Sequence, residues 1–195
     1  RSVSLSSSNA GGLAKTTGLF KDAEGGSLLV NASLEETELG PIMEGRMAIS
    51  NIRLTNVPSL ARLLSLASLS GIIEVLNGEG IMFVRVDVPF RYDGGVLRIK
   101  NARAFGPSLG INIDGEIDGL INEVAISGTL VPAYTINAVL GQIPLIGPLL
   151  VGREGEGVFA LTFGMQGDVD APSITVNPLL SLAPGFLRNF FSGFT

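Results

Sequence analysis

The chain has 195 residues, of which 46% are hydrophobic and only 16% are charged, and its formal net charge is −5. About 25% charged residues is usual for a globular protein, so the low value predicts that part of the surface faces something other than water. The negative charge argues against nucleic-acid binding, which needs a basic field, and the lack of cysteine and histidine removes disulfides, thiolate metal sites and the commonest general base.

The chain begins at Arg1 without a signal peptide, from which we expect an excerpt of a longer protein or a processed product. A transmembrane helix needs roughly 20 continuous apolar residues. The best candidate, 60–76, is interrupted by serines and carries Arg62 and Glu74. We therefore expect any contact with a membrane to be peripheral or to involve single lipid molecules.

Alternation of apolar and polar residues, punctuated by glycine, dominates the chain and is typical of half-buried strands. The pattern predicts a hairpin turn at 93–95 and a bulge or bend near Ser50, where the apolar residues change parity between Ile49 and Ile52. In chain order the predicted strands are 27–36, 43–55, 81–92, 96–104, 109–118, 122–131 and 158–167.

Helices are fewer and short. Pro58 opens an apolar run that ends at Asn77-Gly78, which predicts a helix over 58–77. Further short helices are predicted over 9–20, 135–140, 144–151 and 178–191. Together the elements predict a mainly β (α+β) fold, in which apolar helices interrupt and close an antiparallel meander.

The later strands place their apolar side chains on one face. The first interpretation is that this face packs against the helices, as in any α+β domain. The second is that five to seven strands offer more apolar surface than short helices can cover, which leaves a trough suited to an acyl chain. The candidate lining residues are Ile111, Ile113, Ile117, Val124, Ile126, Leu130, Phe159, Leu161, Phe163 and Met165.

Three patterns suggest catalysis or metal binding, and each has a simpler explanation. The Gly-Pro-Ser-Leu-Gly sequence at 106–110 matches a nucleophile elbow, but it precedes a strand and the chain has no histidine, so it predicts a turn. Asp114, Glu116 and Asp118 have the spacing of glycosidase carboxylates but fit a solvated strand face, and 168–170 lacks the spacing of a calcium loop. We predict no catalytic residue, cofactor or metal, and a protein that is not an enzyme.

The last third of the sequence carries a family resemblance. Residues 128–152 (GTLVPAYTINAVLGQIPLIGPLLVG) and 157–188 (GVFALTFGMQGDVDAPSITVNPLLSLAPGFLR) resemble the C-terminal region of bacterial AsmA-like proteins of the YhdP type. Upstream, 9–34 resembles the helix-then-strand segment of that family. The chain departs from the pattern at Asp170-Ala171-Pro172, and it lacks the N-terminal membrane helix and long strand array of such proteins.

The resemblance implies a strongly twisted antiparallel β-sheet groove with short apolar helices capping its C-terminal end, as in repeating β-groove, bridge-like lipid-transfer proteins. It divides the chain into a β-groove segment, 1–127, and a C-terminal AsmA-like segment, 128–195. It implies the periplasm of a Gram-negative bacterium and an inner-membrane anchor elsewhere in the full-length protein. The implied function is the end of a groove that carries phospholipids between the inner and outer membranes; the alternative is a structural or assembly module of an envelope complex, without transport.

The implied partners are phospholipid acyl chains, a membrane touched peripherally at this end, and other envelope proteins; no nucleic acid is expected. The apolar stretch 141–152 and the C-terminal segment are predicted either to lie on the membrane or only to cap the last strands, with Arg188 placed to meet a lipid phosphate. The residues concerned are Ile143, Leu145, Ile146, Leu149, Leu150, Phe186, Leu187, Arg188 and Phe190.

Overall fold

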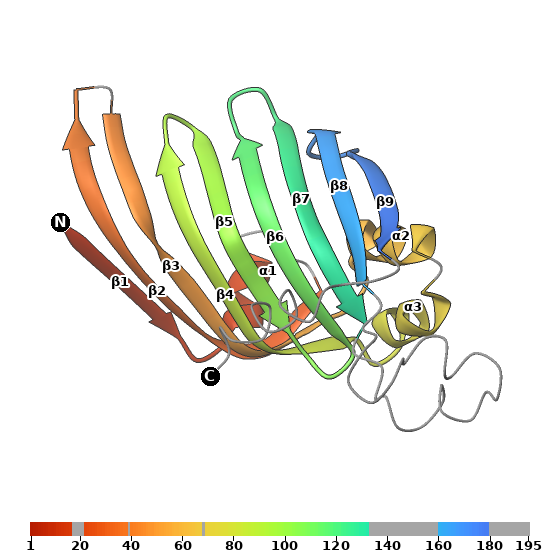
Figure 1. Ribbon diagram of the computed structural model, residues 1–195. Helices are drawn as coiled ribbons and strands as arrows, with labels where there is room; N and C mark the ends of the chain where they lie inside the picture. The colour runs from red at the N-terminus through yellow and green to blue at the C-terminus, as the bar shows by residue number, and fades with distance from the viewer. Residues whose placement is uncertain (17–21, 39, 68, 133–159, 180–195) are drawn as a thin grey trace, which may run out of the picture.

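The computed structural model describes residues 1–16, 22–38, 40–67, 69–132 and 160–179. Within these ranges the chain forms one antiparallel sheet of nine strands whose order in space is their order in sequence, β1 to β9. The sheet is open and curled, with three short helices (Figure 1), so the mainly β, antiparallel prediction is confirmed. The elements are β1 (Ser2–Ser7), α1 (Ala10–Thr16), β2 (Ala23–Thr37), β3 (Gly40–Leu54), α2 (Pro58–Leu66), α3 (Ser70–Asn77), β4 (Ile81–Asp93), β5 (Val96–Phe105), β6 (Leu109–Asp118), β7 (Glu123–Pro132), β8 (Ala160–Asp168) and β9 (Ser173–Leu179).

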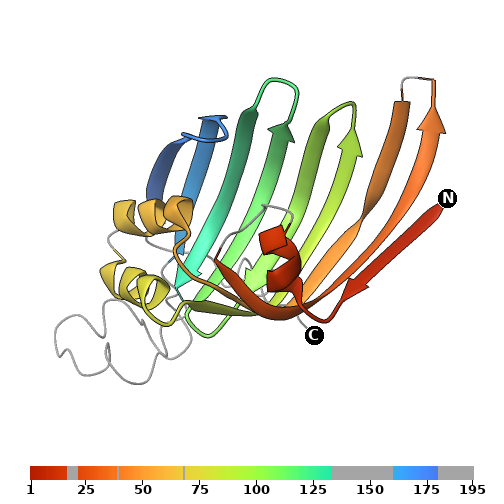
Figure 2. The same ribbon diagram turned by 180° about the vertical axis from the view of Figure 1, so that it is seen from behind.

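The helices lie on one side of the sheet. Figure 2 shows α1 and α2 in front of it, near one end of the strands, while the hairpins at the other end extend past them. Their apolar side chains join those of the sheet in a single core. The largest fully buried side chains among the described residues are Leu64, Leu76, Ile81, Leu109, Leu130 and Leu161, and burying each contributes roughly 1.5–3 kcal/mol.

The predicted helix over 58–77 is wrong in one respect, because the structure divides it into α2 and α3. Leu63 of α2 and Ile72 of α3 are both buried against the sheet. In one continuous helix, with 3.6 residues per turn, residues nine apart face opposite sides. The break around Leu69 lets both halves turn their apolar side to the core. None of the described helices is long and apolar enough to span a bilayer.

The helix predicted over 9–20 begins as α1 and ends at Thr16, before the range 17–21, which lies outside the described residues. Its start is capped by Asn9, whose Oδ1 accepts a hydrogen bond from the Gly12 amide at 2.8 Å. A Cβ on Gly11 would lie 2.6 Å from the carbonyl oxygen of Ala23. Glycine is therefore required where α1 crosses β2.

The parity change in β3 occurs by a bend rather than a bulge. Asn51 has a φ of 55°, and the pairing continues in the same register on both sides of it, with Ser50 opposite Ser27 and Ile52 opposite Gly25. Gly25 itself has a φ of 66°. The neighbouring strands therefore bend together, which brings the apolar residues beyond the bend back to the same face of the sheet.

Two strands were absent from the prediction. β1 is the outermost strand on one side, and β9 is the outermost on the other. The predicted helix over 178–191 is wrong at its start, because β9 extends through Pro178 to Leu179; proline is tolerated in an edge strand. The rest of that helix and the predicted helices 135–140 and 144–151 lie outside the described residues.

Candidate functional site

The candidate site is one face of the sheet, on which apolar residues pair directly across neighbouring strands in four rows. In an antiparallel sheet, directly opposed residues point to the same side. The first row is Leu28, Ile49, Val86, Ala104, Ile111, Leu130 and Leu161. The second is Leu5, Val30, Met47 and Val88, then Ala102, Ile113, Gly128, Phe163 and Val176.

The third row crosses all nine strands without a polar side chain: Val3, Ala32, Gly45, Phe90, Ile99, Gly115, Ile126, Met165 and Ile174. The fourth row is Leu34, Met43, Tyr92, Leu97, Ile117, Val124 and Gly167. These four rows are called the apolar face below. Adjacent strands lie about 4.8 Å apart, so the third row extends for roughly 38 Å.

Nine of the ten predicted lining residues lie on the apolar face, and the tenth, Phe159, is outside the described residues. Ile111, Leu130 and Leu161 are neighbours in the first row. Ile113 and Phe163 belong to the second row, Ile126 and Met165 to the third, and Ile117 and Val124 to the fourth. The structure therefore brings together residues from β6, β7 and β8. That these side chains contact lipid remains a prediction.

Burial is greatest in the first row and falls unevenly toward the fourth, in which Val124 is still buried. Leu130 and Leu161 of the first row are buried in the core that the helices share. In the fourth row Leu97 and Ile117 are only half-buried, and Tyr92 is 40% exposed. The face therefore has a part buried with the helices and a part that is accessible to solvent; Figure 2 shows the helices near one end of the strands, away from the hairpins. The first interpretation therefore applies to the part beneath the helices, and that the exposed part accommodates an acyl chain remains a prediction.

Glycines in the rows make room for large neighbours. Gly128 lies opposite Phe163, and a Cβ on Gly128 would be 2.6 Å from Cζ of that ring. Contacts this short do not occur between real side chains, so the Phe163 ring occupies the space above the glycine.

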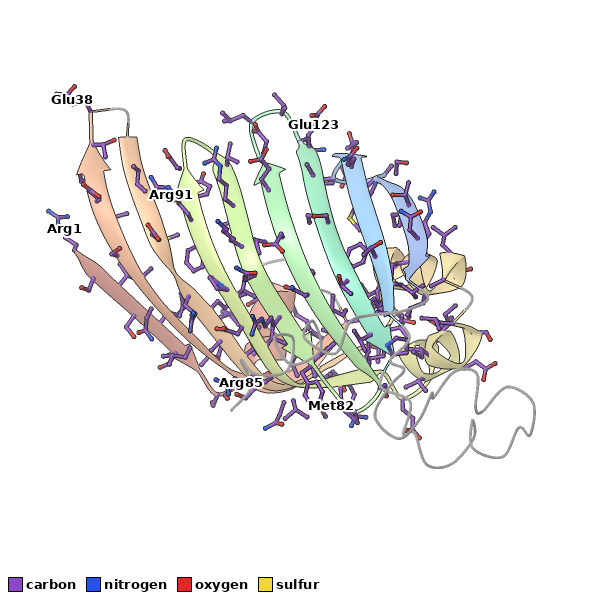
Figure 3. All side chains as sticks on the ribbon, in the orientation of Figure 1. Arg1, Glu38, Met82, Arg85, Arg91 and Glu123 are labelled. Carbon is purple, nitrogen blue, oxygen red and sulfur yellow. The ribbon has the colours of Figure 1, made fainter. Side chains whose placement is uncertain are left out.

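The opposite side, called the polar face, carries the charged side chains of the same strands. Arg98 Nε lies 3.4 Å from Glu116 Oε2, and Arg46 Nε lies 3.5 Å from Asp87 Oδ1. Exposed pairs of this kind contribute little to stability, about 0–1 kcal/mol each. Figure 3 labels Glu38 and Glu123 near the hairpin ends of the strands and Met82 near the other end. The sheet thus has one apolar and one charged side.

The three carboxylates singled out in β6 have separate structural partners. Asp114 Oδ1 accepts a hydrogen bond from the Asn101 amide at 2.8 Å. Glu116 pairs with Arg98. Asp118 Oδ1 accepts one from the Leu120 amide at 2.9 Å, at the start of the turn to β7. These partners account for the three side chains without a shared ligand.

The sequences at 106–110 and 168–170 overlap the connections between β5 and β6 and between β8 and β9. The Gly106 amide donates to the Leu109 carbonyl at 2.9 Å, which closes the connection between β5 and β6. Asp168 Oδ1 accepts a hydrogen bond from the Asp170 amide at 2.8 Å between β8 and β9. Both therefore form the turns that the sequence predicts.

The predicted membrane-contact or cap residues, from Ile143 to Leu150 and from Phe186 to Phe190, lie outside the described residues. The apolar residues of β2 to β5, by contrast, were missed as lining residues. Val30, Met47 and Phe90 lie on the apolar face with Ile126. The alternation within each strand was visible in the sequence, but the bend at Asn51 and a bulge at Asn101 change its parity, so the common face became apparent only from the pairing.

The chain matches no protein-family model, and no curated protein and no solved structure is significantly similar to it. The resemblance to AsmA-like proteins therefore remains a prediction from the motifs.

Proposed function

We propose that this chain forms the terminal part of a hydrophobic groove that carries phospholipids between the inner and outer membranes of a Gram-negative envelope, within an inner-membrane-anchored protein. The observation that carries the proposal is the third row, which is apolar across nine strands and half-buried over most of its length. The motifs of the last third of the sequence give the proposal its cellular setting.

Acyl chains would lie on the accessible part of the apolar face, across the strands, with headgroups in water. Each CH₂ moved from water to an apolar contact contributes about 0.8 kcal/mol. Because neighbouring strands present similar side chains, a chain that moves by one strand exchanges one set of contacts for an equivalent set. No deep minimum holds the lipid, and a gap in the row would impose a barrier.

The helices would set one boundary of the path. α2 and α3 seal the end of the face near Leu64 and Leu76, which are fully buried. An acyl chain is therefore confined to the rows nearer the hairpins. Leu97 and Ile117, which lie opposite each other in the fourth row, would form the floor there.

Native mass spectrometry of the full chain, purified from a Gram-negative host in a detergent-free buffer, tests the proposal. We expect bound phospholipid. Met165→Asp, on the apolar face, is expected to remove it, whereas Gln166→Asp, the next residue on the exposed polar face, is expected to retain it. Folded wild-type protein without any lipid, in this measurement and after incubation with phospholipid vesicles, would refute the proposal.

A second candidate, an assembly module, is favoured by the edge strand β1. Val3 and Leu5 are 45% and 50% exposed there, and β1 has no neighbour on its outer side within the described residues. Exposed edge strands template pairing with another β-chain. Absence of lipid, together with self-association that Val3→Lys and Leu5→Lys abolish in sedimentation experiments, would favour this candidate over transport.

A further inference from the structure

A second feature lies on the polar face, at the centre of β3, β4 and β5. Here the surface forms an open hollow of about 620 Å³. Its basic side chains are Arg46, Arg91, Arg98, Lys100 and Arg103.

The hollow follows from a bulge in β5. The pairing of β5 with β4 shifts between Asp87 and Phe90, and its pairing with β6 shifts between Ile99 and Ala102, so that β5 has one more residue than each neighbour. Asn101 has a φ of 55° at this point. A bulge bends and twists its strand locally, and Pro89 of β4, a small side chain, lies in the hollow that results.

The charge of the hollow differs from that of the chain. Five cations and two carboxylates, Glu44 and Asp87, line it. Asp93 and Glu116 beside it pair with Arg91 and Arg98, which leaves a local net charge of +1, whereas the chain as a whole carries −5. Arg91 Nη1 lies 3.3 Å from Glu44 Oε2, and Asp87 is paired with Arg46. Lys100 and Arg103 make no ion pair with any carboxylate of the described residues.

We propose that this hollow binds a small, multiply charged anion through phosphate or carboxylate groups, with Lys100 and Arg103 as its principal contacts. Arginine and lysine in a concave site concentrate field lines and bind such groups by charge-assisted hydrogen bonds. The hollow is on the opposite side of the sheet from the apolar face, so a lipid on that face does not reach it. The ligand is therefore a soluble anion rather than the headgroup of a transported lipid, and this site stands whether or not the chain carries lipid.

The test is calorimetric titration of the full chain with inorganic tripolyphosphate at low ionic strength. We expect one saturable site that weakens as salt is added. The double variant Lys100→Gln/Arg103→Gln is expected to bind at least about tenfold more weakly, since a hydrogen bond to a charged group is worth roughly that factor or more.

Lys15→Gln/Arg85→Gln is the matched control, because it removes the same charges from exposed positions outside the hollow. Figure 3 labels Arg85 near one end of β4 and Arg91, which lines the hollow, nearer the other. The control is expected to bind within about twofold of wild type, because long-range charge effects are screened. Equal weakening by both doubles, or no saturable binding by wild type, would overturn the proposal.

Circular dichroism of each variant checks that it is folded. If the Lys100→Gln/Arg103→Gln variant is unfolded, the single variant Lys100→Gln, at an exposed position, is titrated in its place. Flotation with phosphatidylcholine vesicles containing phosphatidylglycerol separates the two sources of phosphate. Flotation that depends on Lys100 and is not displaced by tripolyphosphate would assign the hollow to membrane headgroups and contradict a soluble ligand.

Discussion

Replacing Ile126 by aspartate places a charge in the middle of the third row. Ile126 is half-buried between Gly115 and Met165. Full burial of such a side chain is worth 1.5–3 kcal/mol, so half-burial contributes about 1–1.5 kcal/mol to folding, and the new carboxylate stays accessible to water. Typical domains have 5–15 kcal/mol of stability, and we expect Ile126→Asp to fold with a lower melting temperature.

Relative to its total, the binding free energy of lipid is expected to fall by more than the free energy of unfolding. A carboxylate in the row displaces two or three CH₂ groups from apolar contact, at about 0.8 kcal/mol each, which amounts to about 2 kcal/mol or roughly a 30-fold weaker affinity. Titration with a fluorescent phospholipid measures this affinity directly. Ala125→Asp, one residue earlier and exposed on the polar face, is expected to bind lipid like wild type. Equal affinities for wild type and both folded variants would refute the reasoning.

Three further substitutions test the packing that holds the apolar face in place. Gly128→Ala is expected to destabilise the fold by about 1–3 kcal/mol, because its Cβ would collide with the backbone oxygen of Asn112 and with the Phe163 ring. Thermal melting measures this, and an unchanged melting temperature would contradict these contacts. Leu64→Ala, at a fully buried site, is expected to lower the free energy of unfolding in urea by about 2–5 kcal/mol. Leu66→Ala, at a position that is 53% exposed, is expected to lower it by about 0.5 kcal/mol or less. Similar losses for the two variants would argue against α2 packing on the sheet. Asn101→Val is expected to lower the free energy of unfolding by roughly 1–2 kcal/mol, since a β-branched residue is strained at a φ of 55°. Asn101→Gly should leave stability almost unchanged. If chemical unfolding shows the glycine variant to be less stable than the valine variant, the left-handed conformation at the bulge is excluded.

Much of the sheet could be predicted because its strands follow one simple rule. The β6 sequence alternates isoleucine with Asn112, Asp114 and Glu116, and its bounds, Leu109–Asp118, are those predicted. The Gly94-Gly95 turn was equally predictable, because glycine readily adopts the positive φ that such hairpins need, and both residues have it. Short-range pattern and turn chemistry were therefore sufficient for individual strands and hairpins.

The edge strands were harder to predict for physical reasons. β1 has only Val3 and Leu5 as apolar residues among serines, too few to distinguish a strand from a polar loop. β9 includes Pro178, which also serves as a helix start, and the sequence alone favoured the helix. Edge strands bury less than central ones, so their sequences carry a weaker apolar signal.

The rows themselves depend on pairing between strands, which a single sequence does not state. The face of Val88 relative to Ala102 is determined by the extra residue in β5, and that of Ile49 relative to Ile52 by the bend at Asn51. The polar hollow was missed for the same reason, because Lys100 and Arg46 come together only when the strands pair. The sequence indicated which residues are apolar, and the register determined that they form one face.

The most direct test of the account is photocrosslinking with a phospholipid that carries a diazirine in its acyl chain, followed by peptide mass spectrometry of the labelled chain. We expect the labels to fall on the accessible rows, at residues such as Leu97, Ile99 and Ile126. Labels on polar-face neighbours such as Lys100 and Ala125, or labelling no greater than that of a soluble control protein, would contradict it.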